Sequence, residues 1–327
     1  LAGLDHVLAT KTFEPLSWDA VDAVDDSRER SRDGSCRVGV AAKVDGSQNA
    51  VLVGAGVREA PKCRLEGVQH VSARCDGITG LLGVDAGGVL SCRQNDEKLR
   101  LGDARLFPTL SVVDPELMLS VPARLTAYQG FDALFHNVEC LINRHHNPMG
   151  DMVCREGIRN AAAALPTCVN DGGNLEARTR LAFANTLGGY AMVCSGCCGC
   201  HGTEHGMSAH HHDLPHGAGL IMIASAYHTH MIEAHVADDR YVQMARLMGA
   251  DEATVTARGP IAFVDELERL KRDCGVDGLA MSEWGICREE LPAIAENAIT
   301  TNDALFEHDP AQLSVADVTA ILEASWR

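Results

Sequence analysis

The feature that most constrains the fold is a series of long helical patterns that fills the chain from about Asp114 to its C-terminus. Apolar residues recur there at the three- and four-residue spacing of a helix with a buried face. The segments with this spacing are Thr126–Asn143, Leu175–Val193, Gly217–Ala234, Asp239–Met248, Ile261–Cys274 and Glu289–Ile299. We therefore predict an all-helical domain over residues 113–327.

Residues suited to helix ends support these segments. Asn147 can cap a helix that has Pro148 at its first position, and Gly249 can end the helix that precedes it. The segment Ser314–Asp317 resembles a capping box before a final helix that ends near Trp326. These signals predict where individual helices start and stop.

The first 112 residues have a different texture, with many Gly and Val residues and short apolar runs. Cys36–Val44, Ala50–Val53 and Gly67–Ser72 have the length and composition of strands. We therefore expect an α/β domain over residues 1–112, packed against the helical domain with the site in the cleft between them. Prolines place the boundary near residues 108–116.

Bulk composition restricts the class of protein. A formal net charge of −17 would repel a phosphate backbone, so we expect no nucleic-acid partner. An odd count of 13 cysteines predicts reduced thiols in a cytoplasmic protein rather than a disulfide framework. The sequence has neither an apolar run long enough to span a membrane nor the pattern of a secretory signal, so we expect no membrane association.

A group of acidic and histidine residues suggests a metal site. Asp132 and His136 are four residues apart in a helical segment, which places both side chains on one face. Further on, His201, His205 and His216 flank a predicted loop at residues 208–215. Mixed oxygen and nitrogen ligands suit Fe²⁺ or Zn²⁺. The alternative is a solvated or hydrogen-bonded Asp/His pair, and residues 210–212, all histidine, are expected to form a solvated loop.

Longer motifs around these residues carry a family resemblance. Residues 111–118 read SVVDPELM, Pro122 follows, and residues 130–139 read GFDALFHNVE. Residues 201–217 contain HGTEHGM and then LPHG. Together these motifs resemble the signatures of the iron-containing alcohol dehydrogenases, and the resemblance extends over residues 95–327.

The resemblance implies a role for each candidate site residue. The metal ligands of that family fall on Asp132, His136, His201 and His216, and its additional histidine near the nicotinamide falls on His205. The ion would be Fe²⁺ or Zn²⁺, and the second cofactor NAD or NADP. His205 would order the nicotinamide or relay a proton. Its alternative role is to orient a metal ligand.

The implied activity is metal-dependent hydride transfer between a small alcohol and a nicotinamide cofactor, giving an aldehyde or ketone reversibly. The metal would act as a Lewis acid on the substrate oxygen. We expect a homo-oligomer, and specifically a dimer, because cyclic pairs are the commonest assemblies. Two alternatives stay open: a relative that acts on a polyol or a maleylacetate-type acid, and a non-catalytic metal-binding or redox-sensing protein.

The dinucleotide-binding half that the resemblance implies is less distinct. Two glycine-rich turns could approach a pyrophosphate: one contains Gly54 and Gly56, and the other contains Gly87 and Gly88. The alternative is that both are ordinary turns. About 112 residues is short for a complete domain of this kind, and the chain opens with Leu1. We therefore expect this half to be incomplete or poorly assigned, which an intact mass different from 34.9 kDa would show.

Four cysteines form a C-x-x-C-C-x-C pattern at residues 194, 197, 198 and 200. Such a pattern can indicate an iron–sulfur cluster or a structural zinc site. The four lie too close together to wrap one tetrahedral ion without distorting the helix. Cysteine is also a small, burial-prone side chain, so we interpret the cluster as packing at a helix end.

Overall fold

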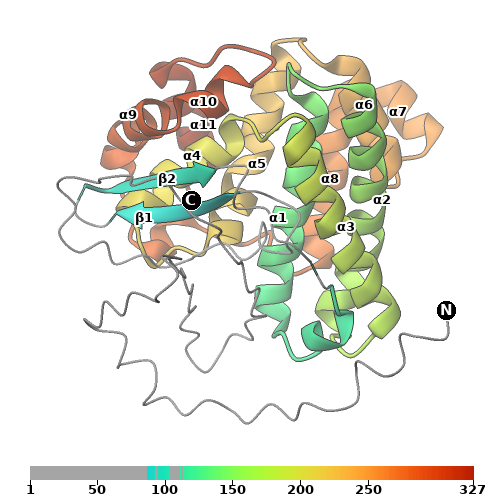
Figure 1. The fold of residues 1–327 in the computed structure, drawn as a ribbon. Coiled ribbons are helices and arrows are strands. Elements are labelled where there is room, and N and C mark those ends of the chain that lie inside the picture. Colours follow the sequence, from blue (N-terminus) through green and yellow to red (C-terminus); the bar gives the residue numbers. More distant parts are fainter. Residues whose placement is uncertain (1–86, 93–94, 103–110, 112) are drawn as a thin grey trace, which may run out of the picture.

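The computed structural model describes residues 87–92, 95–102, 111 and 113–327 (Figure 1). Within residues 113–327 it contains helices and connecting segments and no β-strand, so the predicted helical character of this region is confirmed. The predicted α/β domain lies mostly outside the described residues. That domain and the boundary near residues 108–116 stay predictions.

The helical region consists of successive α-helices joined by short segments, several of which contain 3₁₀ turns. The elements are η4 (Pro115–Met118), α1 (Ala123–Ile142), α2 (Pro148–Asn170), α3 (Leu175–Cys194), α4 (Gly199–His210), α5 (His216–Glu233), α6 (Asp238–Met248), α7 (Glu252–Arg258), η5 (Gly259–Ile261), α8 (Ala262–Asp273), η6 (Met281–Trp284), η7 (Arg288–Glu290), α9 (Leu291–Thr301), α10 (Asp303–Glu307) and α11 (Val315–Ser325).

The predicted helix ends are confirmed. Asn147 caps α2, because its side chain accepts a hydrogen bond from the backbone N–H of Gly150 at 3.0 Å. Ser314 and Asp317 form the capping box of α11. Gly249 ends α6 with a φ of 118°, a left-handed conformation that glycine adopts without strain.

Helix α1 runs through the interior of the helical region. It packs against α2, α3 and α5, and Figure 1 shows α1, α2 and α3 side by side. Sixteen of its 20 residues are buried, so this helix has little solvent-facing surface. Its buried residues include Asp132, His136 and Glu139. Buried polar groups are hydrogen-bonded in folded proteins, so these three side chains should have polar partners inside the core.

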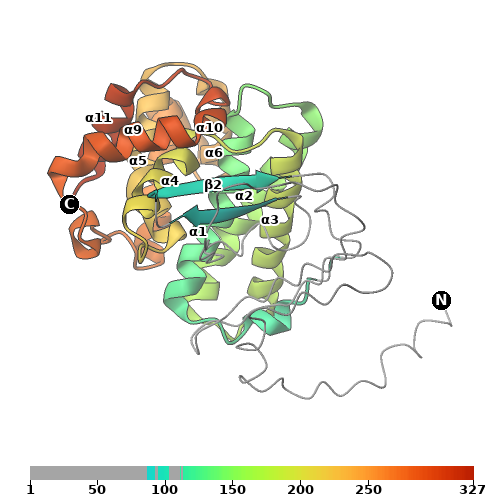
Figure 2. The same cartoon turned by 60° about the vertical axis from the view of Figure 1, so that its left-hand side comes forward.

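A two-stranded antiparallel hairpin lies against the helices. Strands β1 (Gly87–Cys92) and β2 (Glu97–Gly102) pair in register, and β2 packs against α4 and α9. Figure 2 shows the hairpin crossing in front of α4. The turn predicted at Gly87 and Gly88 is therefore wrong, because both residues pair with β2 and belong to a strand. Gly54 and Gly56 lie outside the described residues.

The predicted loop at residues 208–215 is wrong in its first part, because α4 continues to His210. The backbone N–H of His211 closes this last turn on the Met207 carbonyl at 2.9 Å, and His210 Nδ1 lies 3.0 Å from the Gly206 carbonyl oxygen. The three consecutive histidines are half-buried rather than solvated. His211 Nε2 lies 2.9 Å from Glu290 Oε1, and His212 Nε2 lies 3.5 Å from the carboxylate of Asp96.

Among the described helices, none is by itself long and apolar enough to cross a membrane. By length and composition alone, α3 and α4 pass this test together, as a pair bent by 104°.

Candidate metal centre

Asp132 and His136 lie one turn apart on α1, and both side chains are buried. The four-residue spacing directs them to the same side of the helix. Asp132 Oδ1 lies 3.6 Å from His136 Nε2. The pair therefore faces the protein interior, and the alternative of a solvated pair is wrong.

Two further histidines reach the same carboxylate from other helices. His201 lies in the first turn of α4, and His216 is the first residue of α5. Their Nε2 atoms lie 3.2 Å and 3.7 Å from Asp132 Oδ1. With His136, three imidazole nitrogens surround one carboxylate oxygen. The structure thus brings together the four residues that the sequence suggested as ligands.

The charge of Asp132 is set by these neighbours. Burial by itself would raise the pKa of Asp132, but the charges of His136 and His216 and a hydrogen bond with His201 hold this pKa well below its ordinary value. The carboxylate is therefore ionised at neutral pH, which is the state that binds a cation. Imidazoles that converge on a buried anion can exchange their protons for one divalent ion.

Two more carboxylates hold the imidazoles from behind. Glu139 Oε1 lies 2.6 Å from His201 Nδ1, and Glu204 Oε2 is hydrogen-bonded to His216 Nδ1. Both carboxylates are fully buried. Because each occupies a Nδ1 atom, the Nε2 atoms of His201 and His216 stay directed toward Asp132. Carboxylate–histidine pairs of this kind orient metal ligands and make them more basic.

Lys98 enters this region from strand β2. Its Nζ lies 3.3 Å from Glu204 Oε2, 2.9 Å from Ser208 Oγ and 3.3 Å from His216 Nδ1. The side chain is buried, so its charge is compensated locally by Glu204. Burial by itself would raise the pKa of Glu204, but the charges of His216 and Lys98 lower it to about 2. Glu204 is therefore ionised at neutral pH.

His205 lies one turn after His201 on α4 and is also buried. Its ring centroid is 5.5 Å from that of His216 and 6.5 Å from that of His201. Its Nδ1 lies 3.1 Å from Asn302 Oδ1. Burial, together with the positive charges of Lys98 and His216, holds the pKa of His205 well below its ordinary value. His205 is thus a neutral imidazole beside the group around Asp132.

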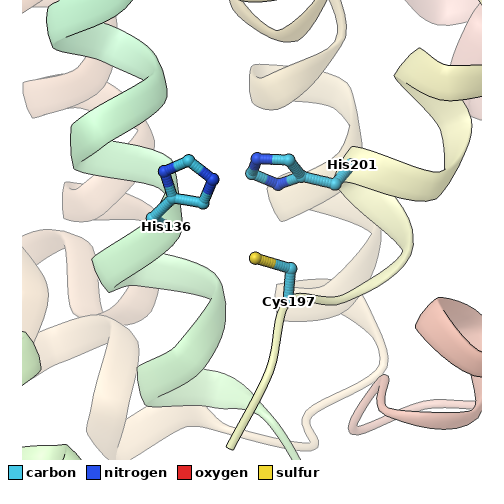
Figure 3. A group of neighbouring side chains, drawn as sticks. All are labelled: His136, Cys197 and His201. Carbon is cyan, nitrogen blue, oxygen red and sulfur yellow. The ribbon is translucent and has the colours of Figure 1, made fainter. Parts of the chain in front are cut away.

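The cysteine pattern divides in the structure. Cys198 and Cys200 are buried in the core, where burial and then nearby carboxylates raise their pKa values well above the ordinary value. They are therefore protonated, which agrees with the packing interpretation. Cys197 has different surroundings, because its Sγ and one ring nitrogen each of His136 and His201 lie within 4.8 Å of one another (Figure 3).

The donor set around Asp132 fits a borderline divalent ion. It offers one ionised carboxylate and three imidazoles, which is the mixture that Fe²⁺ and Zn²⁺ accept. The imidazoles of His201 and His216, bound at Nδ1 by carboxylates, are already turned so that Nε2 is available. The residues present therefore suit the metal that the motif resemblance implies.

Three residues of this region were missed as functional candidates. Glu139 could have been found, because it follows Asp132 by seven residues and His136 by three, on the same helix face. Glu204 is adjacent to His205, but its sequence position does not indicate a contact with His216. Lys98 carries no local signal, because the contact between β2 and α4 arises from packing of distant segments.

Residues 126–326 match the family model described as Fe-containing alcohol dehydrogenase family, C-terminal. Among curated proteins, the chain is 27% identical to the NAD-dependent methanol dehydrogenase of Bacillus methanolicus over 69% of this chain and 58% of that protein. It is 28% identical to the 1,3-propanediol dehydrogenase of Klebsiella pneumoniae over 73% of this chain and 60% of that protein. The chain therefore spans about three fifths of the length of these relatives.

Solved structures give the same result for the fold. An archaeal halo-thermophilic alcohol dehydrogenase from a Red Sea brine pool superposes with a TM-score of 0.70 and 28% identity, covering 76% of this chain and 62% of that one. A 1,3-propanediol oxidoreductase superposes with a TM-score of 0.68 and 26% identity, covering 74% and 62%.

Proposed function

The chain belongs to the iron-containing alcohol dehydrogenase family, and from this premise we propose that it is an oxidoreductase that interconverts a small alcohol and its aldehyde or ketone. The hydride acceptor would be a nicotinamide cofactor, NAD or NADP. The observation that carries the proposal is the convergence of three imidazole Nε2 atoms within 3.7 Å of Asp132 Oδ1.

Asp132, His136, His201 and His216 are the residues that would hold Fe²⁺ or Zn²⁺. Bound there, the ion would supply Lewis-acid activation of the alcohol oxygen. One anionic and three neutral ligands would leave that position with a net charge of about +1, which favours an alkoxide over a neutral alcohol. Glu139 and Glu204 would keep the imidazoles in place during the reaction.

His205 is the proposed proton acceptor. Asn302 Nδ2 donates to Thr301 Oγ1 at 2.9 Å, which turns the amide oxygen of Asn302 toward His205. Nδ1 of His205 then donates to that oxygen, and Nε2 keeps its lone pair. A neutral imidazole in this tautomer can accept the proton that an alcohol releases.

Small primary alcohols and terminal diols are the proposed substrates. The support is that curated relatives act on methanol and on 1,3-propanediol, as their names state. NAD is the cofactor in the name of the methanol enzyme. A polyol is the alternative substrate that the sequence left open. A diol is chemically similar to a polyol.

The test is an alcohol panel with both nicotinamides, run on the purified protein loaded with Fe²⁺ or Zn²⁺ and followed by absorbance of the reduced cofactor. We expect metal-dependent turnover that Asp132→Ala abolishes together with bound metal, because the variant lacks the proposed anionic ligand. Asp213→Ala, at an exposed residue in the segment after α4, is the matched control and should keep both. Tightly bound metal without turnover on any alcohol would instead support the non-catalytic alternative.

We also propose a cytoplasmic homo-oligomer. The nine cysteines whose side chains the structure describes are all free thiols, which suits a reducing compartment. Large apolar side chains are exposed where the start of α2 meets the end of α3, and they are Met149, Met152, Tyr190 and Val193. Such a patch suits a second copy of the chain. Light scattering measures the assembly, and a monomeric mass at micromolar concentration would refute it.

A further inference from the structure

Cys197 is the side chain whose position the proposed function leaves unexplained. It precedes α4, and its Sγ faces the imidazoles of His136 from α1 and His201 from α4 (Figure 3). One donor atom from each of the three residues lies within 4.8 Å of the other two, and all three side chains are buried. The two rings stack with centroids 4.6 Å apart and an angle of 26° between their planes.

The backbone around Cys197 is held in place by several hydrogen bonds. Asn143 Nδ2 donates to the carbonyl of Gly196 at 3.0 Å, and His308 Nδ1 donates to the carbonyl of Cys197 at 3.1 Å. Glu139 accepts from the backbone N–H of Cys198 at 2.8 Å. These bonds hold the backbone of Gly196, Cys197 and Cys198, so the position of the thiol is fixed by the surrounding helices.

The neighbouring thiols have partners of their own. Cys198 Sγ donates to the carbonyl of Glu139 at 3.5 Å, and Cys140 Sγ donates to the carbonyl of Gly196 at 3.1 Å and also lies within hydrogen-bond reach of the Cys197 thiol. Among the described residues, Cys197 is the one cysteine that belongs to a group of side chains close enough together to hold a metal ion. The C-x-x-C-C-x-C pattern therefore places one sulfur, not four, beside imidazoles.

We propose that Cys197, His136 and His201 form a second coordination position for a thiophilic divalent cation such as Zn²⁺. The inference rests in part on the proposed function, because His136 and His201 are shared with the site around Asp132. Zn²⁺ binds thiolate sulfur at about 2.3 Å and imidazole nitrogen at about 2.0 Å, so ligand atoms in a tetrahedral site lie about 3.5 Å apart. Side-chain rotations that move each donor atom by about 1 Å would bring the three donor atoms from within 4.8 Å of one another to that separation.

The two positions differ in chemistry. Binding at Cys197 displaces the thiol proton to solvent and adds a thiolate to the ligand set. A thiolate is softer and donates more charge than an imidazole, so this position selects Zn²⁺, Cd²⁺ or Co²⁺ over harder ions. An ion held there would be a weaker Lewis acid than one held with His216. The identity of the metal would thus decide which position is filled.

Cobalt spectroscopy tests this proposal without relying on activity. The metal-free, reduced protein is titrated with Co²⁺ to one equivalent under anaerobic conditions. We expect a sulfur-to-cobalt charge-transfer band in the near ultraviolet, together with visible d–d bands. Cys197→Ser should lose the charge-transfer band, whereas Cys200→Ser, which alters a buried thiol of the same segment, should keep it.

Three results would overturn the proposal: bound Co²⁺ without a charge-transfer band, a band that survives Cys197→Ser, or no Co²⁺ binding. Should Cys197→Ser fail to fold, X-ray absorption of the zinc-loaded protein decides, because a missing sulfur neighbour at about 2.3 Å refutes the ligand. Alcohol turnover measured on the Fe²⁺-loaded protein separates the two proposals. Turnover with Fe²⁺ but no band with Co²⁺ defeats this inference alone, and the band with Co²⁺ but no turnover on any alcohol with Fe²⁺ defeats the proposed function alone.

Discussion

At the scale of single residues, His205 offers the sharpest test of the proposed chemistry. It is buried and neutral, with its pKa held below the ordinary value by burial and by the charges of Lys98 and His216. We expect His205→Ala to keep the bound metal and to slow turnover by about 10²- to 10⁴-fold, the usual contribution of a general base. Metal content and steady-state rates measured on the same sample check this.

The pH profile follows from the direction of that pKa shift. A base with a lowered pKa stays unprotonated until the pH falls well below 6.5, so the acid limb of kcat/KM should lie below that value. The limb should disappear in His205→Ala. His210→Ala, at the end of the same helix, is the control and should leave the profile unchanged. Weakened metal binding with an unaltered profile would instead assign His205 to orienting a ligand.

Glu204 should matter for metal affinity more than for the chemical step. Glu204→Gln removes the negative charge that His216 Nδ1 and Lys98 Nζ contact. We expect metal affinity to fall about 10- to 100-fold, as is usual when a carboxylate behind a histidine ligand is lost. Competition with a chromogenic chelator measures it.

Lys98→Met combined with Glu204→Gln separates two causes of such a loss. If the single substitution acts by leaving the charge of Lys98 buried without Glu204, the double variant should recover metal affinity. If it acts through His216, the double variant should keep the weakened affinity. An unchanged affinity in Glu204→Gln would show that the contact with His216 does not support a metal ligand.

At the scale of elements, the approach of α5 to α1 places His216 near Asp132. A Cβ added at Gly217 would lie 2.2 Å from the carbonyl oxygen of Tyr128, a backbone atom that cannot rotate away. We expect Gly217→Ala to push the start of α5 outward, to destabilise the protein by about 1–3 kcal/mol and to weaken metal binding. Denaturant unfolding measures the stability.

Gly278→Ala is the matched control, because a Cβ there would meet nothing within 4 Å. It should change stability by less than about 0.5 kcal/mol, as surface substitutions usually do. Equal stability of the two variants would mean that α5 can shift without cost, and the contact with α1 would then not position His216.

At the scale of the whole molecule, the site joins three helices that are distant in sequence. Asp132 and His136 come from α1, His201 from α4 and His216 from α5. A metal that binds the folded protein at 100 times its Kd adds about 2.7 kcal/mol of stability. We therefore expect a chelator to lower Tm by about 4 °C, because unfolding a chain of 327 residues carries an entropy of about 2.1 cal/mol/K per residue. Asp132→Ala should show no such shift.

Much of the helical framework could be predicted from local sequence. The spacing of apolar residues located most of the helices to within a few residues but did not predict α4, and Asn147, Gly249 and Ser314 marked ends that the structure confirms. These predictions succeeded because the helical period and the capping bonds depend on residues close together in the chain. The predicted turn at Gly87 and Gly88 failed because strand pairing, a longer-range interaction, decided their conformation.

The sequence by itself determined which side chains share a helix face, such as Asp132 with His136 and His201 with His205, because the helical repeat fixes these directions. The tertiary structure alone decided which faces meet. It brought Lys98 to Glu204, 106 residues away, and it turned one cysteine of the C-x-x-C-C-x-C pattern toward His136 and His201. Contacts between elements depend on how apolar surfaces pack together, and no local spacing encodes that packing.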